Sequence, residues 1–238
     1  MKAVVCLPTY NERPNLEPMV RALGDVLPEG GRVLVIDDSS PDGTGELADS
    51  LADSLAYVDV LHRPRKEGLG PAYLAGFGRA LELGADLVLE MDCDFSHDPR
   101  DVPRFVEAAQ DADLVLGSRY VPGGSIPSWG PLRRAVSRGG NVYAQALLGL
   151  PYRDLTGGFK CYRRDVLETI ELSDVSSRGY AFQIETTYRT HRGGFRIVEI
   201  PIAFVEREVG HSKMTQDIVL EAMWKVPVLR IAALRGRL

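Results

Sequence analysis

Cysteine is scarce in this sequence of 238 residues, and its three copies, Cys6, Cys93 and Cys161, lie far apart. An odd number at wide spacing gives neither a disulfide framework nor a zinc pattern, which indicates a reducing compartment. The sequence also lacks a run of about 18 uncharged apolar residues, the length that a membrane-spanning helix needs. Its first residues have no signal-peptide pattern. These absences predict a chain that is soluble or peripheral to a membrane.

Positive charge is in deficit, with 28 Lys and Arg residues against 33 Asp and Glu residues and a net charge of −5 at pH 7. That balance argues against a nucleic-acid partner. The hydrophobic share of 45% is ordinary for a soluble protein with a substantial core. The length suits one domain with additions. We expect a single domain over residues 1–238, in which 214–238 form a basic amphipathic helical tail.

Short apolar runs alternate with helical patterns through the first half of the sequence. We expect strands at 3–7, 32–36, 57–61 and 85–89, and helices at 14–27, 44–55 (capped by Thr44) and 68–83. This alternation predicts right-handed crossovers and a mostly parallel sheet flanked by helices, a Rossmann-like α/β fold. Further on we expect helices at 100–110 and 133–148, strands at 113–116, 195–200 and 203–205, and a loop at 121–130.

Acidic side chains follow three of the expected strands. They are Glu12, then Asp37, Asp38 and Asp42, then Asp92 and Asp94. Because the carboxyl ends of parallel strands meet at one edge of a sheet, these loops are expected to converge there. Asp92 and Asp94 are two residues apart, and their hard carboxylate oxygens suit Mg²⁺ or Mn²⁺ held together with substrate phosphates. A lone Asp-x-Asp is more often a solvated loop, but three loops in register favour a site.

The turn after the first expected strand is Pro8-Thr9-Tyr10-Asn11-Glu12, without the glycine pattern of a dinucleotide-binding fold. This stretch and residues 35–44, 66–70 and 92–99 resemble the family 2 inverting glycosyltransferases, which have the GT-A fold. Residues 117–120, 155–160 and 204–214 narrow the resemblance to the dolichol-phosphate mannosyltransferases, whose bacterial members make polyprenol monophosphomannose. The resemblance covers nearly the whole chain in order.

The resemblance implies transfer of mannose from GDP-mannose to a polyprenyl phosphate with inversion, with Mg²⁺ or Mn²⁺ as cofactor, at the cytosolic face of a membrane. It assigns nucleoside binding to Pro8, Tyr10, Glu12, Ile36 and Asp38. It assigns the donor and metal site to Asp92, Cys93 and Asp94, with Asp94 as the direct metal ligand. Ser96 stands where the family often has a further ligand, commonly Gln, and is a weaker candidate ligand.

The basic residues take the phosphate-binding roles under the same resemblance. Arg119 matches a diphosphate or sugar contact and completes a catalytic set with Asp92 and Asp94. Arg207 and Lys213 match a segment that closes over the donor phosphates, and Arg133 and Ser137 match the acceptor-phosphate site. The alternative for each arginine is a solvated salt-bridge partner on the surface.

The expected chemistry agrees with the residue types. A lipid monophosphate has a second pKa of about 6, so at neutral pH the nucleophile is already anionic. Such a nucleophile needs no strong general base, and we nominate no catalytic His or Cys; His97 is interpreted as a residue that supports its turn. Catalysis then depends on positioning two anions and stabilising the leaving diphosphate, with arginines offsetting the repulsion.

Two apolar stretches are candidates for the lipid. One is the 121–130 loop, where Ile126 and Trp129 are expected to be exposed. The other is a C-terminal stripe of Leu220, Met223, Trp224, Val228, Ile231 and Leu234, accompanied by Lys225, Arg230, Arg235 and Arg237. A basic amphipathic helix with a Trp is typical of membrane-surface binding, but the same period also describes a helix packed on its own domain. A membrane-anchoring partner is a further possibility.

Three other functions stay open at this stage. The same reaction with UDP-glucose is the nearest, and the nucleotide sugar that stabilises the protein distinguishes it. A non-catalytic module that binds a nucleotide sugar is a second, although Asp92, Asp94, Arg119 and Arg207 argue against it. A metal-dependent nucleotidyltransferase is the third, and release of pyrophosphate would identify it.

Overall fold

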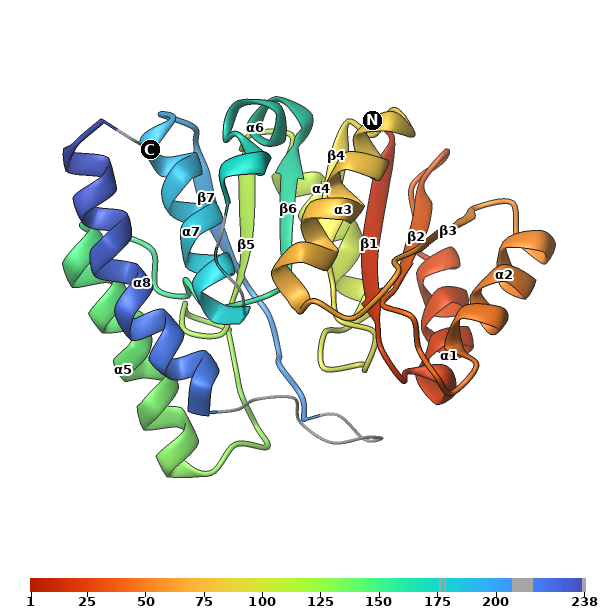
Figure 1. The fold of residues 1–238 in the computed structure, drawn as a ribbon, viewed down its shortest axis with the longest axis horizontal. Coiled ribbons are helices and arrows are strands. Elements are labelled where there is room, and N and C mark those ends of the chain that lie inside the picture. Colours follow the sequence, from red (N-terminus) through yellow and green to blue (C-terminus); the bar gives the residue numbers. More distant parts are fainter. Residues whose placement is uncertain (176, 178, 207–215, 237–238) are drawn as a thin grey trace.

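One seven-stranded sheet runs through the computed structural model, which describes residues 1–175, 177, 179–206 and 216–236 (Figure 1). The strands are β1 (Ala3–Thr9), β2 (Arg32–Asp37), β3 (Val58–His62), β4 (Leu87–Glu90), β5 (Leu114–Ser118), β6 (Lys160–Arg163) and β7 (Ile197–Pro201). Their order is β3-β2-β1-β4-β6-β5-β7. Only β6 is antiparallel to its neighbours, β4 and β5. The expected mostly parallel sheet is confirmed.

Helices cover both faces of the sheet, because the buried side chains of β1 alternate between the two faces. Val5 and Leu7 point to one face and pack with α1 (Arg13–Gly24), α2 (Thr44–Ser54) and α4 (Val102–Ala108). Val4 and Cys6 point to the other and pack with α3 (Leu69–Glu82), α6 (Arg164–Thr169) and α7 (Gly179–Arg192). The short helices η1 (Pro99–Asp101) and η2 (Leu172–Asp174) lie in the connections.

A third apolar cluster joins α5 (Pro131–Leu148), α7 and α8 (Gln216–Leu234). Its members on α8 are Val226, Leu229 and Ala233, which are buried. Helices α5 and α8 lie side by side beyond the β7 end of the sheet (Figure 1). Among the described residues, no helix combines the length and apolarity needed to span a membrane.

The structure corrects several expectations. Thr44 is the first residue of α2 rather than its cap: Gly43, with φ at 84°, occupies the cap position, and the Asp42 carboxylate accepts from the Thr44 amide. The expected strand at 203–205 is wrong, because Ala203 forms only an isolated bridge with Ser125. The sequence pattern indicates no helix or strand between residues 149 and 194, yet this segment contains β6, α6, η2 and α7. Strand β6 is only four residues long, and many buried residues of α7 are polar, so neither shows a clear apolar pattern.

The expected exposure of Ile126 and Trp129 is also wrong. Both side chains are buried. The Trp129 ring packs edge-to-face on Phe204, with centroids 5.5 Å apart. The loop therefore folds back onto the domain, and these two residues do not provide an exposed lipid site.

Candidate active site

The loops after β1, β2 and β4 lie together, because these strands are adjacent and parallel. They occupy the lower edge of the sheet in Figure 1. The expected convergence of the three acidic loops is confirmed. Each loop contains a non-glycine residue with positive φ: Asn11 (56°), Ser39 (58°) and Phe95 (60°). Backbone strain of this kind concentrates at functional sites, which supports a site at this edge.

The acidic loop after β2 contains an ion pair. Asp38 is buried and accepts a short hydrogen bond from Arg63, which follows β3. Burial raises the pKa of Asp38, and the Arg63 guanidinium offsets only part of that rise. Asp37 accepts from the amide and hydroxyl of Ser40 and so holds the turn. Of the two carboxylates, Asp38 is the one paired with a strong cation.

The remaining nucleoside candidates line the ends of β1 and β2. Glu12 is buried; its amide donates to Thr44 Oγ1 at 3.1 Å. Lys66 Nζ lies 3.9 Å from the centroid of the Tyr10 ring. Pro8 and Ile36 are paired in register across the two strands. The Ile36 side chain is fully buried in the core, so a contact from this residue to a ligand would use its backbone.

The loop after β4 holds the candidate metal ligands. Asp94 is buried, and its Oδ1 accepts from the Ser96 amide at 3.0 Å. Ser96 Oγ is buried and has no hydrogen-bond partner within the described part of the chain. Cys93 is buried and in no disulfide, whereas the side chain of Asp92 is 34% exposed. An orphaned hydroxyl beside a buried carboxylate is a feature that a bound cation would satisfy.

The side chain of His97 contacts the loop after β4 and helps to hold its shape. Its Nδ1 accepts from the Asp92 amide at 3.3 Å, and its ring packs against Phe159 and Phe204. Burial lowers the pKa of His97 to about 4, so the imidazole is neutral at neutral pH. This geometry agrees with its interpretation as a supporting residue.

Arg119 follows β5, at the same edge. Its Nε and Nη2 each donate to the Asp154 carboxylate at 2.7 Å, and Nη2 also donates to Thr156. Burial alone would lower the pKa of Arg119, but the charge and hydrogen bonds of Asp154 outweigh it and raise the pKa. The guanidinium is therefore held rigidly, with most of its charge compensated inside the protein.

Arg133 and Ser137 lie one helical turn apart on α5, so they share a face. Arg133 pairs with Glu206 at 2.7 Å and stacks on Trp129, with Cζ 4.1 Å from the ring centroid. Arg119 lies 5.4 Å from the same ring. The structure thus brings the two arginines to one aromatic side chain.

Sequence reasoning missed the partners of these residues. Arg63 is 25 positions from Asp38, and Asp154 is 35 positions from Arg119. No local pattern marks such pairs. Two predicted donor-phosphate residues, Arg207 and Lys213, lie outside the described residues.

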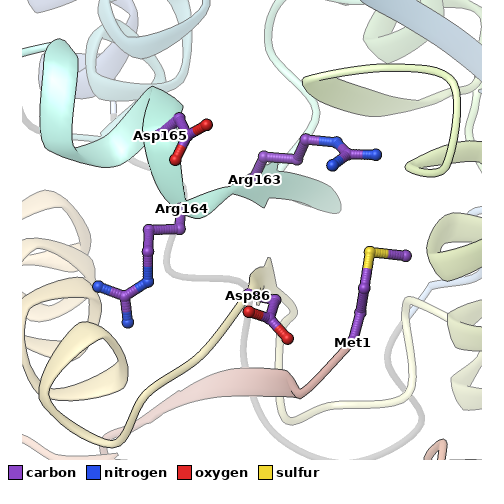
Figure 2. A pocket seen from close by; sticks show the side chains of 5 residues that line it. All are labelled: Met1, Asp86, Arg163, Arg164 and Asp165. Atoms are coloured by element: carbon purple, nitrogen blue, oxygen red, sulfur yellow. The ribbon is translucent and has the colours of Figure 1, made fainter.

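A separate hollow of about 260 Å³ opens at the opposite end of the strands (Figure 2). It is lined by Met1, Asp86, Arg163, Arg164 and Asp165. Both arginines donate to backbone carbonyl groups, and acidic side chains lie beside them. The hollow offers little to an anionic ligand, so the carboxyl edge remains the candidate site.

The chain resembles known proteins along its whole length. The family model described as glycosyl transferase family 2 matches residues 4–171. An undecaprenyl-phosphate mannosyltransferase of Micrococcus luteus is 49% identical over 242 residues, covering 100% of this chain and 99% of that protein. A polyprenol monophosphomannose synthase of Mycolicibacterium smegmatis is 48% identical over 241 residues, covering 100% of this chain and 89% of that protein.

A solved structure shares the fold at low identity. Glucosyl-3-phosphoglycerate synthase from Mycobacterium tuberculosis, in complex with Mn²⁺, UDP and glucosyl-3-phosphoglycerate, superposes with a TM-score of 0.69 and is 18% identical. The match covers 99% of this chain and 80% of that one. The expected GT-A fold is confirmed.

Proposed function

The chain belongs to glycosyltransferase family 2, and from this premise we propose that it transfers mannose from GDP-mannose to a polyprenyl phosphate. One observation carries the proposal: the three acidic loops lie at the same edge of the sheet as Arg119, and Arg119 and Arg133 both contact Trp129. Two relatives with nearly half their residues identical, named for polyprenyl-phosphate mannosyl transfer, support the sugar and acceptor. The donor nucleotide rests on the motif resemblance.

The nucleoside is proposed to bind at the ends of β1 and β2, where Pro8, Tyr10, Glu12, Ile36 and Asp38 gather. Asp38 is a directed acceptor here, because Arg63 fixes its carboxylate. A guanine base presents N–H donors along one edge, which a fixed carboxylate or backbone carbonyl can accept. UDP-glucose remains the alternative donor.

A divalent cation fits the loop after β4. Asp94 supplies a buried carboxylate, Ser96 supplies an unsatisfied hydroxyl, and Asp92 lies at the rim. Within the described residues no group of three or more His, Cys, Asp or Glu side chains could hold a metal. The few oxygen ligands that Asp94, Ser96 and Asp92 offer suit Mg²⁺ or Mn²⁺ that is shared with substrate phosphates rather than enclosed by protein alone. When bound, the cation would stabilise negative charge on the leaving diphosphate.

The reaction is proposed as one displacement. An oxygen of the acceptor phosphate attacks the anomeric carbon of mannose, the bond from that carbon to the diphosphate oxygen breaks, and GDP leaves. Attack from the far side inverts the α-linked donor to a β-mannosyl phosphate. The acceptor is already anionic at neutral pH, so no protein base is required. A neutral, buried His97 agrees with this scheme, because it supports the loop without exchanging protons.

The arginines have different tasks in this proposal. Asp154 compensates Arg119, so Arg119 contributes a directed donor rather than net positive charge. Its Nη1 is the nitrogen not engaged by Asp154 or Thr156 in the described chain. Arg133 is partly exposed, and among the described residues its ion pair is the one from its Nη1 to Glu206. An acceptor phosphate could displace that surface carboxylate at little cost, because exposed ion pairs are weak.

The membrane surface is proposed to meet α5 and α8. On α8 the stripe residues Met223, Trp224, Val228, Ile231 and Leu234 are exposed, Trp224 by 74%. On α5, Leu132, Val136, Val142 and Leu147 are exposed. Helix α5 carries three arginines and no acid, although the chain as a whole has a charge of −5. Exposed apolar side chains with local positive charge suit an anionic bilayer.

The direct test is transfer from labelled GDP-mannose, or labelled UDP-glucose, to undecaprenyl phosphate in detergent, followed by lipid extraction. Mannose in the lipid fraction supports the proposal. Glucose alone in the lipid fraction would mean that the same reaction uses UDP-glucose as its donor. Absence of lipid-linked sugar from either donor would favour a binding role.

A further inference from the structure

Ser137 has a partner that the motif resemblance does not assign. The Tyr120 hydroxyl lies 2.7 Å from Ser137 Oγ. Tyr120 comes directly after Arg119 at the end of β5, whereas Ser137 is in the second turn of α5. This hydrogen bond therefore joins the carboxyl edge of the sheet to the helix proposed to bind the acceptor phosphate.

The chemistry of the two hydroxyl groups sets the direction of this bond. A phenol has a pKa of about 10 and is a far better donor than a serine hydroxyl. Tyr120 therefore donates, and Ser137 Oγ accepts. The proton of Ser137 is then left for another acceptor.

Helical Ser and Thr hydroxyls can donate that proton to the carbonyl four residues back. Ser54, Thr169 and Thr190 do so here. Ser137 makes no such bond in the described structure, and its side chain is half-buried. Within the described residues its O–H has no protein acceptor, and it lies beside Arg133 on the same helix face.

The Tyr120 ring also lies among cations. The Cζ atoms of Arg119 and Arg138 are each 5.5 Å from its centroid, within the range of a cation–π contact. The ring therefore contacts both guanidinium groups, while its hydroxyl reaches Ser137. Arg138 is exposed and has no ion pair within the described chain, so its charge is available to an incoming anion.

We propose that Tyr120 is a positioning residue for the acceptor phosphate: its hydroxyl occupies one lone pair of Ser137 Oγ and leaves the Ser137 proton for a phosphate oxygen, while its ring contacts Arg119 and Arg138. This inference rests on the proposed function, because Ser137 is assigned to the acceptor there. The ligand it recognises is a phosphate monoester dianion. The nucleotide sugar is not part of this contact.

The test is Tyr120→Phe, which keeps the ring and removes the hydroxyl. Loss of one oriented hydrogen bond predicts a rise of roughly fivefold in KM for undecaprenyl phosphate, with KM for GDP-mannose changed by less than about twofold. Tyr143→Phe is the matched control. Tyr143 lies on α5, the helix of Ser137, but its hydroxyl donates to the Met223 carbonyl, outside the proposed phosphate site. The control is expected to leave both KM values unchanged.

A double-mutant cycle separates this role from a general structural one. Adding Tyr120→Phe to Ser137→Ala is expected to raise the acceptor KM no further, because the hydroxyl acts through Ser137. Full additivity of the two changes, or an unchanged acceptor KM in Tyr120→Phe, would overturn the inference. Thermal unfolding of each variant identifies a loss caused by misfolding.

Failure of the proposed function is distinguishable from failure of this inference. Binding of undecaprenyl phosphate is measured by calorimetry on the same proteins, without any donor. Binding that Tyr120→Phe weakens would support the inference even if no mannose is transferred. Wild-type protein that does not bind the lipid phosphate would overturn it.

Discussion

The Arg119 guanidinium and the Asp154 carboxylate form a buried bidentate ion pair, with Nε 2.7 Å from Oδ2 and Nη2 2.7 Å from Oδ1. Their side chains are 5% and 0% exposed. The Arg119 amide also donates to Oδ2 at 2.9 Å, so backbone and side chain meet on one carboxylate. The strand end that presents Arg119 is thereby fixed to the segment that precedes β6.

Removing Asp154 should destabilise the protein strongly. Asp154→Ala leaves a buried guanidinium without its counter-charge, a change that costs about 3 kcal/mol or more in free energy of unfolding. Urea denaturation measures this cost. Glu17→Ala is the control, because it removes an exposed pair with Arg21 and should cost less than about 0.5 kcal/mol. Equal effects of the two substitutions would contradict the structural importance of the Arg119 pair.

Asp94→Ala should abolish mannosyl transfer while leaving the fold intact. Its carboxylate is buried beside the unsatisfied Ser96 hydroxyl, and we propose that both face the cation. The measurement is transfer with added Mg²⁺, Mn²⁺ or chelator, together with the melting temperature of each protein. A fully active Asp94→Ala protein that still requires metal would refute the assignment of this ligand.

Lys160 should make stability depend on pH in the alkaline range. It is fully buried, donates to the Gln183 carbonyl, and burial lowers its pKa to about 8 from 10.5. Between these two values the unfolded chain binds the proton that the folded chain has released, so the free energy of unfolding rises with pH. Relative to that of Lys160→Met, the free energy of unfolding of the wild-type protein should rise by about 3 kcal/mol between these two pH values.

Chemical denaturation of both proteins at pH 7, 8, 9 and 10 measures this difference. Comparison with Lys160→Met cancels the contributions of titrating groups that do not interact with Lys160. A difference that stays constant, or falls, as pH rises would mean that Lys160 keeps its proton in the folded protein.

Trp224→Ala combined with Ile231→Ala should weaken binding to anionic vesicles without lowering the melting temperature. Both side chains are exposed on α8, by 74% and 48%. The measurement is co-sedimentation with phosphatidylglycerol vesicles at low and high salt. Leu229→Ala is the contrasting variant: this buried residue should reduce stability by about 2 kcal/mol or more. Undiminished vesicle binding by the double variant would rule out α8 as the contact.

The first half of the fold was predictable because its signals are local. Apolar runs such as 3–7 and 32–36 belong to strands buried on both faces, and the helices between them have clear apolar stripes. Strand β6 was not predictable, because its buried Lys160 interrupts any apolar pattern. The burial of Trp129 was missed for a related reason: it depends on Phe204, far along the chain.

The residues of the candidate site fall into the same two groups, those marked by local sequence and those defined by contacts between distant residues. Asp92 and Asp94 are marked by their spacing after a strand, so a single stretch reveals them. Asp154 and Tyr120 are defined by what they touch, and the contacts of each are formed by folding. On α8 the members of the predicted stripe from Met223 onward are exposed, because Val226, Leu229 and Ala233 provide the packing face instead.

The most direct test of the central claim is the structure of the product. Wild-type protein is incubated with GDP-α-mannose, undecaprenyl phosphate and Mg²⁺, and the extracted lipid is analysed by NMR at the anomeric carbon. The account predicts a β-linked mannosyl phosphate, formed together with GDP and absent when metal is chelated. An α-linked product, or GDP formed with free mannose and no lipid, would contradict it.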